Sequence, residues 1–318
     1  MNRRRFLERG SAAAAGVGAL RRRLPGAQPP SAPIPRRPLG KTGERVSILC
    51  FGGTAVMSVE QSYANNLVAE AFDRGINYFD VSPTYGSAEE RLGPALAPYR
   101  KRCFLASKTD SRDRAGVERD LEKSLDALRT DHLDLYQHHA LQKLAELDVL
   151  FGPNGAMEGF EKARKDGKVR FLGFSAHSVE VALEAIRRAH FDVVLFPTNY
   201  VLFSKANFGP TVLDKVRSAG AGYVALKAMA RGKYPADWTE NRRTPLCWYE
   251  PCGLPAEASL ALRWTLSQPV DAAIPPGNPA WFRLAMDVAQ GYRPVTAEES
   301  RQLLTYAGAA EPLFQLGA

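Results

Sequence analysis

Cysteine is scarce in this sequence, and no long apolar run occurs in it. Four cysteines in 318 residues are too few for a fold that depends on disulfide bonds. Because no window holds about 20 apolar residues with few charges, we expect no membrane-spanning helix in the mature domain. No spacing of cysteine and histidine is typical of a metal site. The remaining composition, with 45% hydrophobic and 24% charged residues, is that of a globular protein and excludes collagen and disordered chains.

The positive charge is confined to one end of the chain. Nine of the 42 basic residues, all arginines, and one of the 34 acidic residues lie in residues 1–37, which therefore carry the whole net charge of +8. The rest of the chain holds 33 residues of each sign. A domain that binds nucleic acid carries a basic face on its folded part, so we expect no nucleic-acid partner.

Residues 1–37 have the layout of a targeting segment, with a charged start, an Ala/Gly-rich stretch and a proline-rich tail. The run from Arg3 to Leu7 resembles the twin-arginine export motif, in which two arginines precede Phe-Leu. This resemblance implies the twin-arginine export machinery as a partner and a periplasmic location, or a membrane anchor if the segment is not cleaved. The alternative is a basic disordered arm that binds an acidic partner. Residues 38–318 are then expected to form a single domain.

Eight short apolar runs alternate with helical patterns after Pro38. Each run is rich in β-branched or aromatic residues and is bounded by Gly, Pro or Asp, which is typical of strands. The runs lie at residues 47–52, 77–82, 103–109, 133–139, 169–176, 192–199, 222–228 and 271–277. Eight strand–helix units in about 270 residues predict an α/β fold of the (β/α)8 TIM-barrel type, preceded by a hairpin in residues 38–47. The alternative, a doubly wound sheet, would need a GxGxxG turn after its first strand, which residues 51–54 do not provide.

Polar residues at the ends of the expected strands are the candidates for chemistry, because the active sites of such barrels lie at the carboxyl ends of the strands. The second strand ends in Asp80 and its loop carries Tyr85, while the third strand ends in Lys108 and the fourth in His139. These four groups should converge on one rim, where a lysine can pair with an acid and lower the pKa of a phenol. His138 should point to the other side of its strand.

The segments NYFDVSPTYGSAEERLG, LASKTD and LDLYQHHA, in this order, resemble the Asp, Tyr, Lys and His motifs of the aldo-keto reductase family. The resemblance runs over residues 38–290 and implies a (β/α)8 barrel plugged by the hairpin. It also implies an NAD(P)H-dependent enzyme that reduces a small carbonyl substrate. By position, Tyr85 would be the general acid, Lys108 would lower its pKa, and Asp80 would hold Lys108 in place. His139 would orient and polarise the carbonyl.

The same resemblance implies a cofactor site made by Gly53, Thr54, Asp80, Ser175, Asn199, Leu226, Arg231 and Gly277. Leu226 takes the place of the aromatic residue that stacks on nicotinamide, and Arg231 takes a place near the pyrophosphate. Two positions depart from the family, since Ala176 replaces an asparagine and Leu195 a glutamine. The basic residue and serine expected near the 2′-phosphate are missing, and Arg283 is the basic residue that could reach it. We therefore expect NADP to be favoured over NAD, with low discrimination.

Residues 230–255 form a long loop after the seventh strand and hold Tyr234, Trp238, Trp248 and Tyr249. These aromatic residues either cover the substrate or pack on one another at the surface. Cys247 and Cys252 in the same loop either pair in an exported protein or stay reduced, because twin-arginine cargo folds before export.

Two classes of function remain open. The first is an oxidoreductase, either an exported carbonyl reductase or an enzyme that oxidises an alcohol or sugar with a retained cofactor. The second is a non-catalytic or sensor barrel that binds a nucleotide or sugar-like ligand without turnover, which the changes at Ala176 and Leu195 would permit. The complete set of four rim residues favours an enzyme, because a binding protein has no need of a proton-transfer set.

Overall fold

The computed structural model describes residues 32–239, 246–308 and 310–316. The expected export motif falls within residues 1–31 and lies outside the described residues. Residues from Ala32 onward belong to one structural unit. Within the described ranges, no helix is long and apolar enough to cross a membrane.

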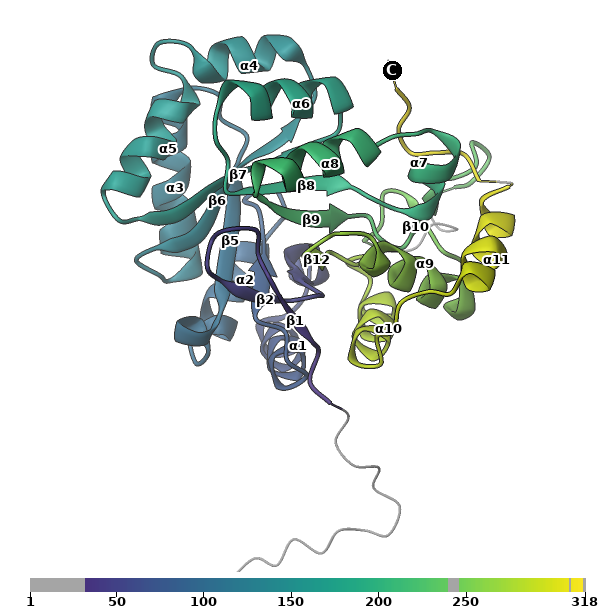
Figure 1. Cartoon of the computed structure of the whole chain (residues 1–318). Helices are drawn as coiled ribbons and strands as arrows, with labels where there is room; N and C mark the ends of the chain where they lie inside the picture. Colours follow the sequence, from purple (N-terminus) through teal and green to yellow (C-terminus); the bar gives the residue numbers. More distant parts are fainter. Residues whose placement is uncertain (1–31, 240–245, 309, 317–318) are drawn as a thin grey trace, which may run out of the picture. The chain divides into compact units, whose positions relative to one another are not determined.

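Eight parallel strands form the centre of this unit (Figure 1). They are β3 (Phe51–Gly52), β4 (Tyr78–Asp80), β5 (Phe104–Thr109), β6 (Leu133–Leu141), β7 (Val169–Ala176), β8 (Val193–Pro197), β9 (Gly222–Leu226) and β12 (Ala272–Ala273). Neighbours in this order are hydrogen-bonded, and a parallel bridge from Leu49 to Ala273 joins the two ends. Each of the eight predicted runs overlaps one of these strands, so the (β/α)8 barrel is confirmed.

The strands are buried on both faces, as is usual for a parallel sheet covered by helices. One apolar cluster fills the barrel interior and includes Leu135, Val193 and Val224. A larger cluster, which includes Leu105 and Tyr136, lies between the strands and the surrounding helices. Alternate residues of each strand therefore enter different cores, and this alternation decides which polar side chains reach the interior.

Helices follow most of the strands and surround them (Figure 1). They are α1 (Gln61–Asp73), α2 (Ala88–Leu96), α3 (Arg114–Leu128), α4 (Leu144–Phe151), α5 (Ala156–Lys165), α6 (Val179–Arg188), α7 (Tyr200–Lys205), α8 (Pro210–Ala219), α9 (Pro255–Ser267), α10 (Pro279–Gln290) and α11 (Ala297–Ala307). Helix α3 shows how the sequence specifies them. The Asp113 side chain caps its first turn by accepting from the Gly116 N–H, and the apolar residues of its 3.6-residue period, from Val117 to Leu128, are buried.

An antiparallel hairpin of β1 (Arg36–Pro38) and β2 (Arg45–Ser47) precedes the barrel. Arg36 and Arg37, which the sequence assigns to the leader, therefore lie in a strand. The guanidinium of Arg37 donates to the backbone oxygens of Leu266 and Val270. Gly40 has a φ of +50°, and a Cβ there would lie 2.3 Å from the Gly222 nitrogen, so the hairpin can approach β9 only with glycine at this turn.

A second antiparallel pair, β10 (Ala230–Gly232) and β11 (Glu250–Pro251), lies within the long loop between β9 and α9. The C-terminal segment after α11 packs near this loop, because Lys233 contacts Glu311 and the ring of Phe314 lies 6.3 Å from that of Trp248. The loop and the C-terminal segment thus lie together at the barrel end where the polar rim is expected.

Candidate active site

The polar rim residues follow apolar residues that fill the barrel interior. Phe104 and Ala106 of β5 belong to the interior cluster, and the alternation of side chains brings Lys108 to the same face. Asp80 on β4 and His139 on β6 lie at equivalent ends of their strands. Local strand geometry therefore brings three of the four predicted residues together at one end of the barrel.

Lys108 and Asp80 form a buried ion pair. Nζ of Lys108 also donates to the Val81 carbonyl at 2.8 Å, and the amide of Gln137 donates to the other Asp80 oxygen at 2.9 Å. Burial disfavours the charge on Lys108, but Asp80 and Tyr85 together outweigh burial and raise the pKa of Lys108. The lysine is therefore held in place and charged. Sequence reasoning missed Gln137, although it shares the interior face of β6 with Leu135 and His139.

Tyr85 lies in the loop after β4, beside this ion pair. The Lys108 Nζ lies 5.1 Å from the centre of the Tyr85 ring, and the ring centres of Tyr85 and His139 are 5.8 Å apart. Burial raises the pKa of Tyr85, and the charge of Lys108 together with its hydrogen bond offsets only part of this rise. The structure thus differs from the expected net lowering, because desolvation of the phenolate exceeds its attraction to the lysine.

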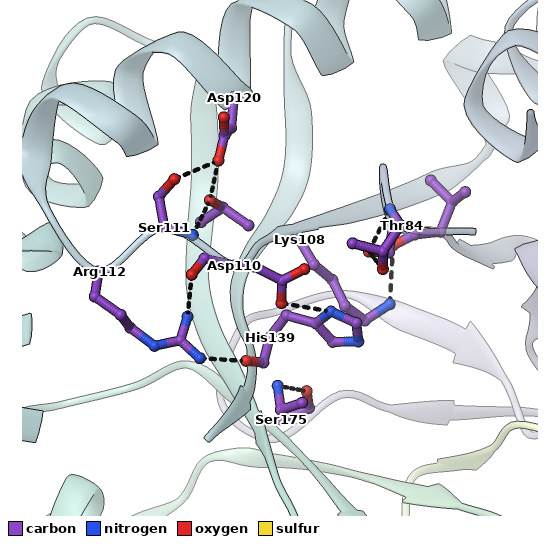
Figure 2. A network of polar contacts seen from close by, with 12 residues as sticks. Thr84, Lys108, Asp110, Ser111, Arg112, Asp120, His139 and Ser175 are labelled. Carbon is purple, nitrogen blue, oxygen red and sulfur yellow. Dashed lines mark hydrogen bonds and ion pairs between the residues drawn. The ribbon is translucent and has the colours of Figure 1, made fainter. Parts of the chain in front are cut away.

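His139 is held by two residues of the loop after β5 (Figure 2). The carboxylate of Asp110 lies 2.9 Å from Nδ1 of the ring, and Arg112 donates to the His139 backbone oxygen at 2.7 Å. The contact with His139 lowers the pKa of Asp110. Sequence reasoning did not single out Asp110. Its place two residues after Lys108, just beyond the same strand, is the signal that could have found it.

His138 points to the opposite face of β6, as predicted. Its ring is fully buried and its centre lies 3.9 Å from that of Phe160, in the layer between strands and helices. Burial lowers the pKa of His138 well below its usual value. This histidine therefore remains neutral and belongs to the core.

A cavity of about 100 Å³ opens at the rim. It is lined by Gly52, Thr54, Asp80, Tyr85, Leu226, Lys227, Leu246, Trp248, Tyr249, Ile274, Pro275 and Gly277. The structure therefore brings three of the predicted cofactor residues, Thr54, Leu226 and Gly277, together with Asp80 and Tyr85. A Cβ on Gly277 would lie 2.5 Å from Oγ1 of Thr54, so these two loops meet too closely for any other residue. Gly53 packs just as closely against Val81.

Ser175 and Asn199 make contacts within the protein beside this cavity. Oγ of Ser175 accepts the Ala140 N–H at 2.8 Å, which leaves its hydroxyl hydrogen to donate elsewhere. The side-chain oxygen of Asn199 caps α7 by accepting the Leu202 N–H, and its amide donates to the Lys227 carbonyl at 3.3 Å. Both side chains are buried, and both fix the backbone at the ends of barrel strands.

Arg231 and Arg283, the two arginines considered for phosphate contacts, already face acids. Arg231 lies 3.6 Å from a Glu250 oxygen and 3.9 Å from a Glu257 oxygen. Arg283 on α10 contacts Glu70 on α1 through both Nε and a terminal nitrogen, at 3.0 and 2.9 Å. A phosphate at either position would have to compete with a carboxylate.

The aromatic residues of the long loop divide between the two roles considered from the sequence, covering the substrate and packing on one another. Trp248 and Tyr249 line the cavity beside Tyr85. Tyr234 and Trp238 instead pack on each other, with ring centres 5.7 Å apart.

Cys247 and Cys252 of the same loop are free, buried thiols. Burial raises the pKa of Cys247 to about 11, and that of Cys252 well above its usual value. Thiols that stay protonated are poor nucleophiles, so neither is a candidate for covalent chemistry.

Comparison with known proteins places this site in a family. The model of the aldo/keto reductase family matches residues 48–245, which is more than half of the chain. The chain belongs to the aldo/keto reductase family. As an aldo/keto reductase it is an oxidoreductase, and the matched residues include Asp80, Tyr85, Lys108 and His139.

Individual relatives agree with this assignment. An uncharacterized oxidoreductase of Bacillus subtilis, YrpG, is 29% identical over 278 residues, which cover 73% of this chain and 83% of that protein. The L-galactose dehydrogenase of Arabidopsis thaliana is 26% identical over 227 residues, 64% of this chain and 70% of that protein. Among solved structures, the putative aldo-keto reductase PA4992 of Pseudomonas aeruginosa is 28% identical with a TM-score of 0.64, over 81% of this chain and 96% of that chain. The aldo-keto reductase AKR11C1 of Bacillus halodurans shares the fold, with 22% identity and a TM-score of 0.68. The match covers 87% of this chain and 98% of that chain.

Proposed function

We propose that this aldo/keto reductase reduces an aldehyde or ketone to an alcohol with NADPH or NADH, and that Tyr85 is the proton donor. The observation that carries the proposal is the placement of the Tyr85 phenol beside the buried Lys108–Asp80 pair, in one cavity with Thr54, Leu226 and Gly277. A phenol next to a fixed ammonium group can give up a proton and be stabilised as the phenolate.

Each rim residue has a distinct task in this proposal. Reduction leaves negative charge on the carbonyl oxygen, and the Tyr85 hydroxyl donates its proton to that atom. Lys108, kept charged by Asp80, stabilises the phenolate that remains. His139 orients the same oxygen through Nε2, and Asp110 holds the ring in place through Nδ1.

A nicotinamide cofactor, when bound, supplies the hydride. Thr54, Leu226 and Gly277 are the described residues that would hold its reactive end, since they line the cavity with Tyr85. Because Arg283 is paired with Glu70, we infer that NADP is favoured over NAD only weakly.

A binding titration followed by a rate measurement tests the proposal. NADPH and NADH are titrated against the purified protein by fluorescence, and a panel of small aldehydes is then tested for turnover by the wild type and by Tyr85→Phe. We expect nucleotide binding by both proteins and turnover by the wild type. Absence of nucleotide binding by the wild type would exclude this function, and binding without turnover of any aldehyde would favour the sensor alternative.

We also propose that residues 1–37 direct export through the twin-arginine machinery, which would place the enzyme in the periplasm. The order of charged, Ala/Gly-rich and proline-rich stretches and the paired Arg3 and Arg4 support this. Changing both arginines to lysine keeps the charge but removes the guanidinium pair, and should stop export. The matched control changes Arg22 and Arg23 to lysine. Undiminished export of the first double mutant contradicts the proposal.

A further inference from the structure

Lys227 follows Leu226 at the end of β9, and it lines the cavity that holds Tyr85. Its φ of +60° lies in the left-handed region, which a lysine adopts only at some cost. The amide of Asn199 donates to the Lys227 carbonyl and supports this conformation. The side chain is only 9% exposed. A strained turn, held by a neighbouring buried residue, thus places an ammonium group in the wall of the cavity.

No carboxylate neutralises this ammonium group among the residues that the structure describes. Nζ of Lys227 lies 3.0 Å from Nε2 of His177, 5.3 Å from the ring centre of Trp248 and 5.7 Å from that of Phe314. His177 brings no negative charge, and burial, with the charge of Lys227 second, lowers its pKa to about 2. Burial, with Lys108 second, lowers the pKa of Lys227 itself to about 7. The surroundings of Lys227 therefore disfavour its charged form.

The charged side chains that line the cavity do not neutralise one another. Asp80 and Lys227 are the two charged side chains among its lining residues. Both Asp80 oxygens are already used, one by Lys108 and the other by Gln137. The positive charge of Lys227 is left without a partner. A buried cation of this kind is unfavourable until an anion enters beside it.

We propose that Lys227 binds a carboxylate or similar anionic group of the substrate, so that the preferred substrates are carbonyl compounds that carry a negative charge. This inference rests on the proposed carbonyl reduction at Tyr85. Tyr85 and Lys227 line the same cavity, so a short acid can place its carbonyl at one and its carboxylate at the other. The rings of Trp248 and Phe314 lie near the ammonium group, and Lys227 is only 9% exposed, which strengthens an ion pair formed there.

The test compares 4-formylbenzoate with its methyl ester, which has nearly the same shape and no charge. The ratio of kcat/KM for the acid to that for the ester is measured in the wild type, Lys227→Met and Lys227→Arg. Lys215→Met, which removes an exposed lysine of α8, is the matched control. We expect Lys227→Met to lower the ratio by about 10–100-fold, Lys227→Arg to retain much of it, and the control to leave it unchanged. Methionine keeps the unbranched shape and most of the length of the side chain, and it meets the same backbone strain as lysine.

A second measurement separates binding of the substrate anion from other causes of a change in activity. The dissociation constant of NADPH is measured for each variant. A loss of NADPH affinity above about tenfold in Lys227→Met, with an unchanged acid-to-ester ratio, would assign the lysine to a cofactor phosphate and overturn the proposal. An unchanged ratio with unchanged NADPH affinity overturns it as well.

If the wild type reduces neither compound, no ratio is obtained, and calorimetric binding of 4-formylbenzoate alone decides the role of Lys227. The proposed function is then decided by the wider panel of aldehydes. Tighter binding to the wild type than to Lys227→Met then upholds an anion site. Equal binding excludes it.

Discussion

The carboxylate of Asp110 lies 2.9 Å from Nδ1 of His139 at the rim of the barrel. The two residues come from the ends of neighbouring strands, β5 and β6, and Figure 2 shows the carboxylate directed at the ring. A carboxylate at this distance fixes the orientation of the imidazole ring, so that Nε2 can face a substrate oxygen. Asp110 is thus a positioning residue for His139 in the proposed reaction.

Asp110→Asn tests this relationship, because the amide keeps the size of the side chain and removes its charge. We expect kcat/KM for aldehydes to fall about tenfold or more while the melting temperature stays close to that of the wild type. Steady-state rates measure kcat/KM, and thermal unfolding measures the melting temperature. Asp126→Asn, an exposed position on α3, serves as the control. An unchanged rate in Asp110→Asn would mean that His139 works without its carboxylate.

Tyr85→Phe removes the proposed proton donor and leaves the ring. We expect turnover to fall by about 10²–10⁴ with nearly unchanged cofactor affinity. Lys108→Met should lower turnover by a similar factor. The double mutant should lower turnover little more than either single mutant does, because both residues act on one proton. Single-turnover rates with saturating cofactor measure the three effects. Retention of most of the wild-type rate by Tyr85→Phe would transfer the role of acid to another group, His139 first.

The pH dependence of reduction follows from the raised pKa of Tyr85. The reaction needs the protonated phenol, and a pKa above the usual value of about 10 keeps that form through neutral and mildly alkaline pH. Activity is lost only as the pH rises through the raised pKa. We expect kcat/KM for the reduction of uncharged aldehydes to be level between about pH 6 and 9, while alcohol oxidation, which needs the phenolate, rises with pH. A midpoint of the reduction profile below about pH 9 contradicts the assignment.

Arg283→Ala should change the affinity for NADPH less than about threefold, because the guanidinium is already paired with Glu70. The informative partner variant is Glu70→Gln, which removes the competing charge and should raise the preference for NADPH over NADH. Fluorescence titration with both nucleotides measures these affinities. A strong NADPH preference in the wild type that disappears in Arg283→Ala would instead show that Arg283 binds the 2′-phosphate.

Asp134→Ala should destabilise the fold without touching the active site. This buried carboxylate accepts the Leu105 N–H at 2.8 Å and contacts Arg100 at 3.1 Å and Arg170 at 2.6 Å. Its removal leaves the buried Leu105 N–H without an acceptor and takes one carboxylate from each arginine, at a cost of about 2–4 kcal/mol in the free energy of unfolding. Denaturant titration measures this value. Asp131→Ala, at an exposed neighbouring acid, is the control, and equal stability of the two variants would contradict the argument.

The sequence predicted those features that depend on local patterns. Apolar runs located all eight strands, and polar residues near the carboxyl ends of the strands located Asp80, Lys108 and His139, because period-two alternation and strand ends are visible along the chain. It did not predict contacts between distant residues. The ion pair of Arg283 with Glu70 joins positions 213 residues apart, and the direction of the Tyr85 pKa depends on how far the ring is desolvated.

The hairpin of β1 and β2 finds its partners near the other end of the chain. Arg37 donates to backbone oxygens 229 and 233 positions away, and the Gly40 N–H donates to Asp271, 231 positions away. During synthesis this hairpin leaves the ribosome before the barrel strands but can dock only after the last strand has emerged. Its docking therefore marks a completed barrel, and a loose hairpin marks an unfinished one.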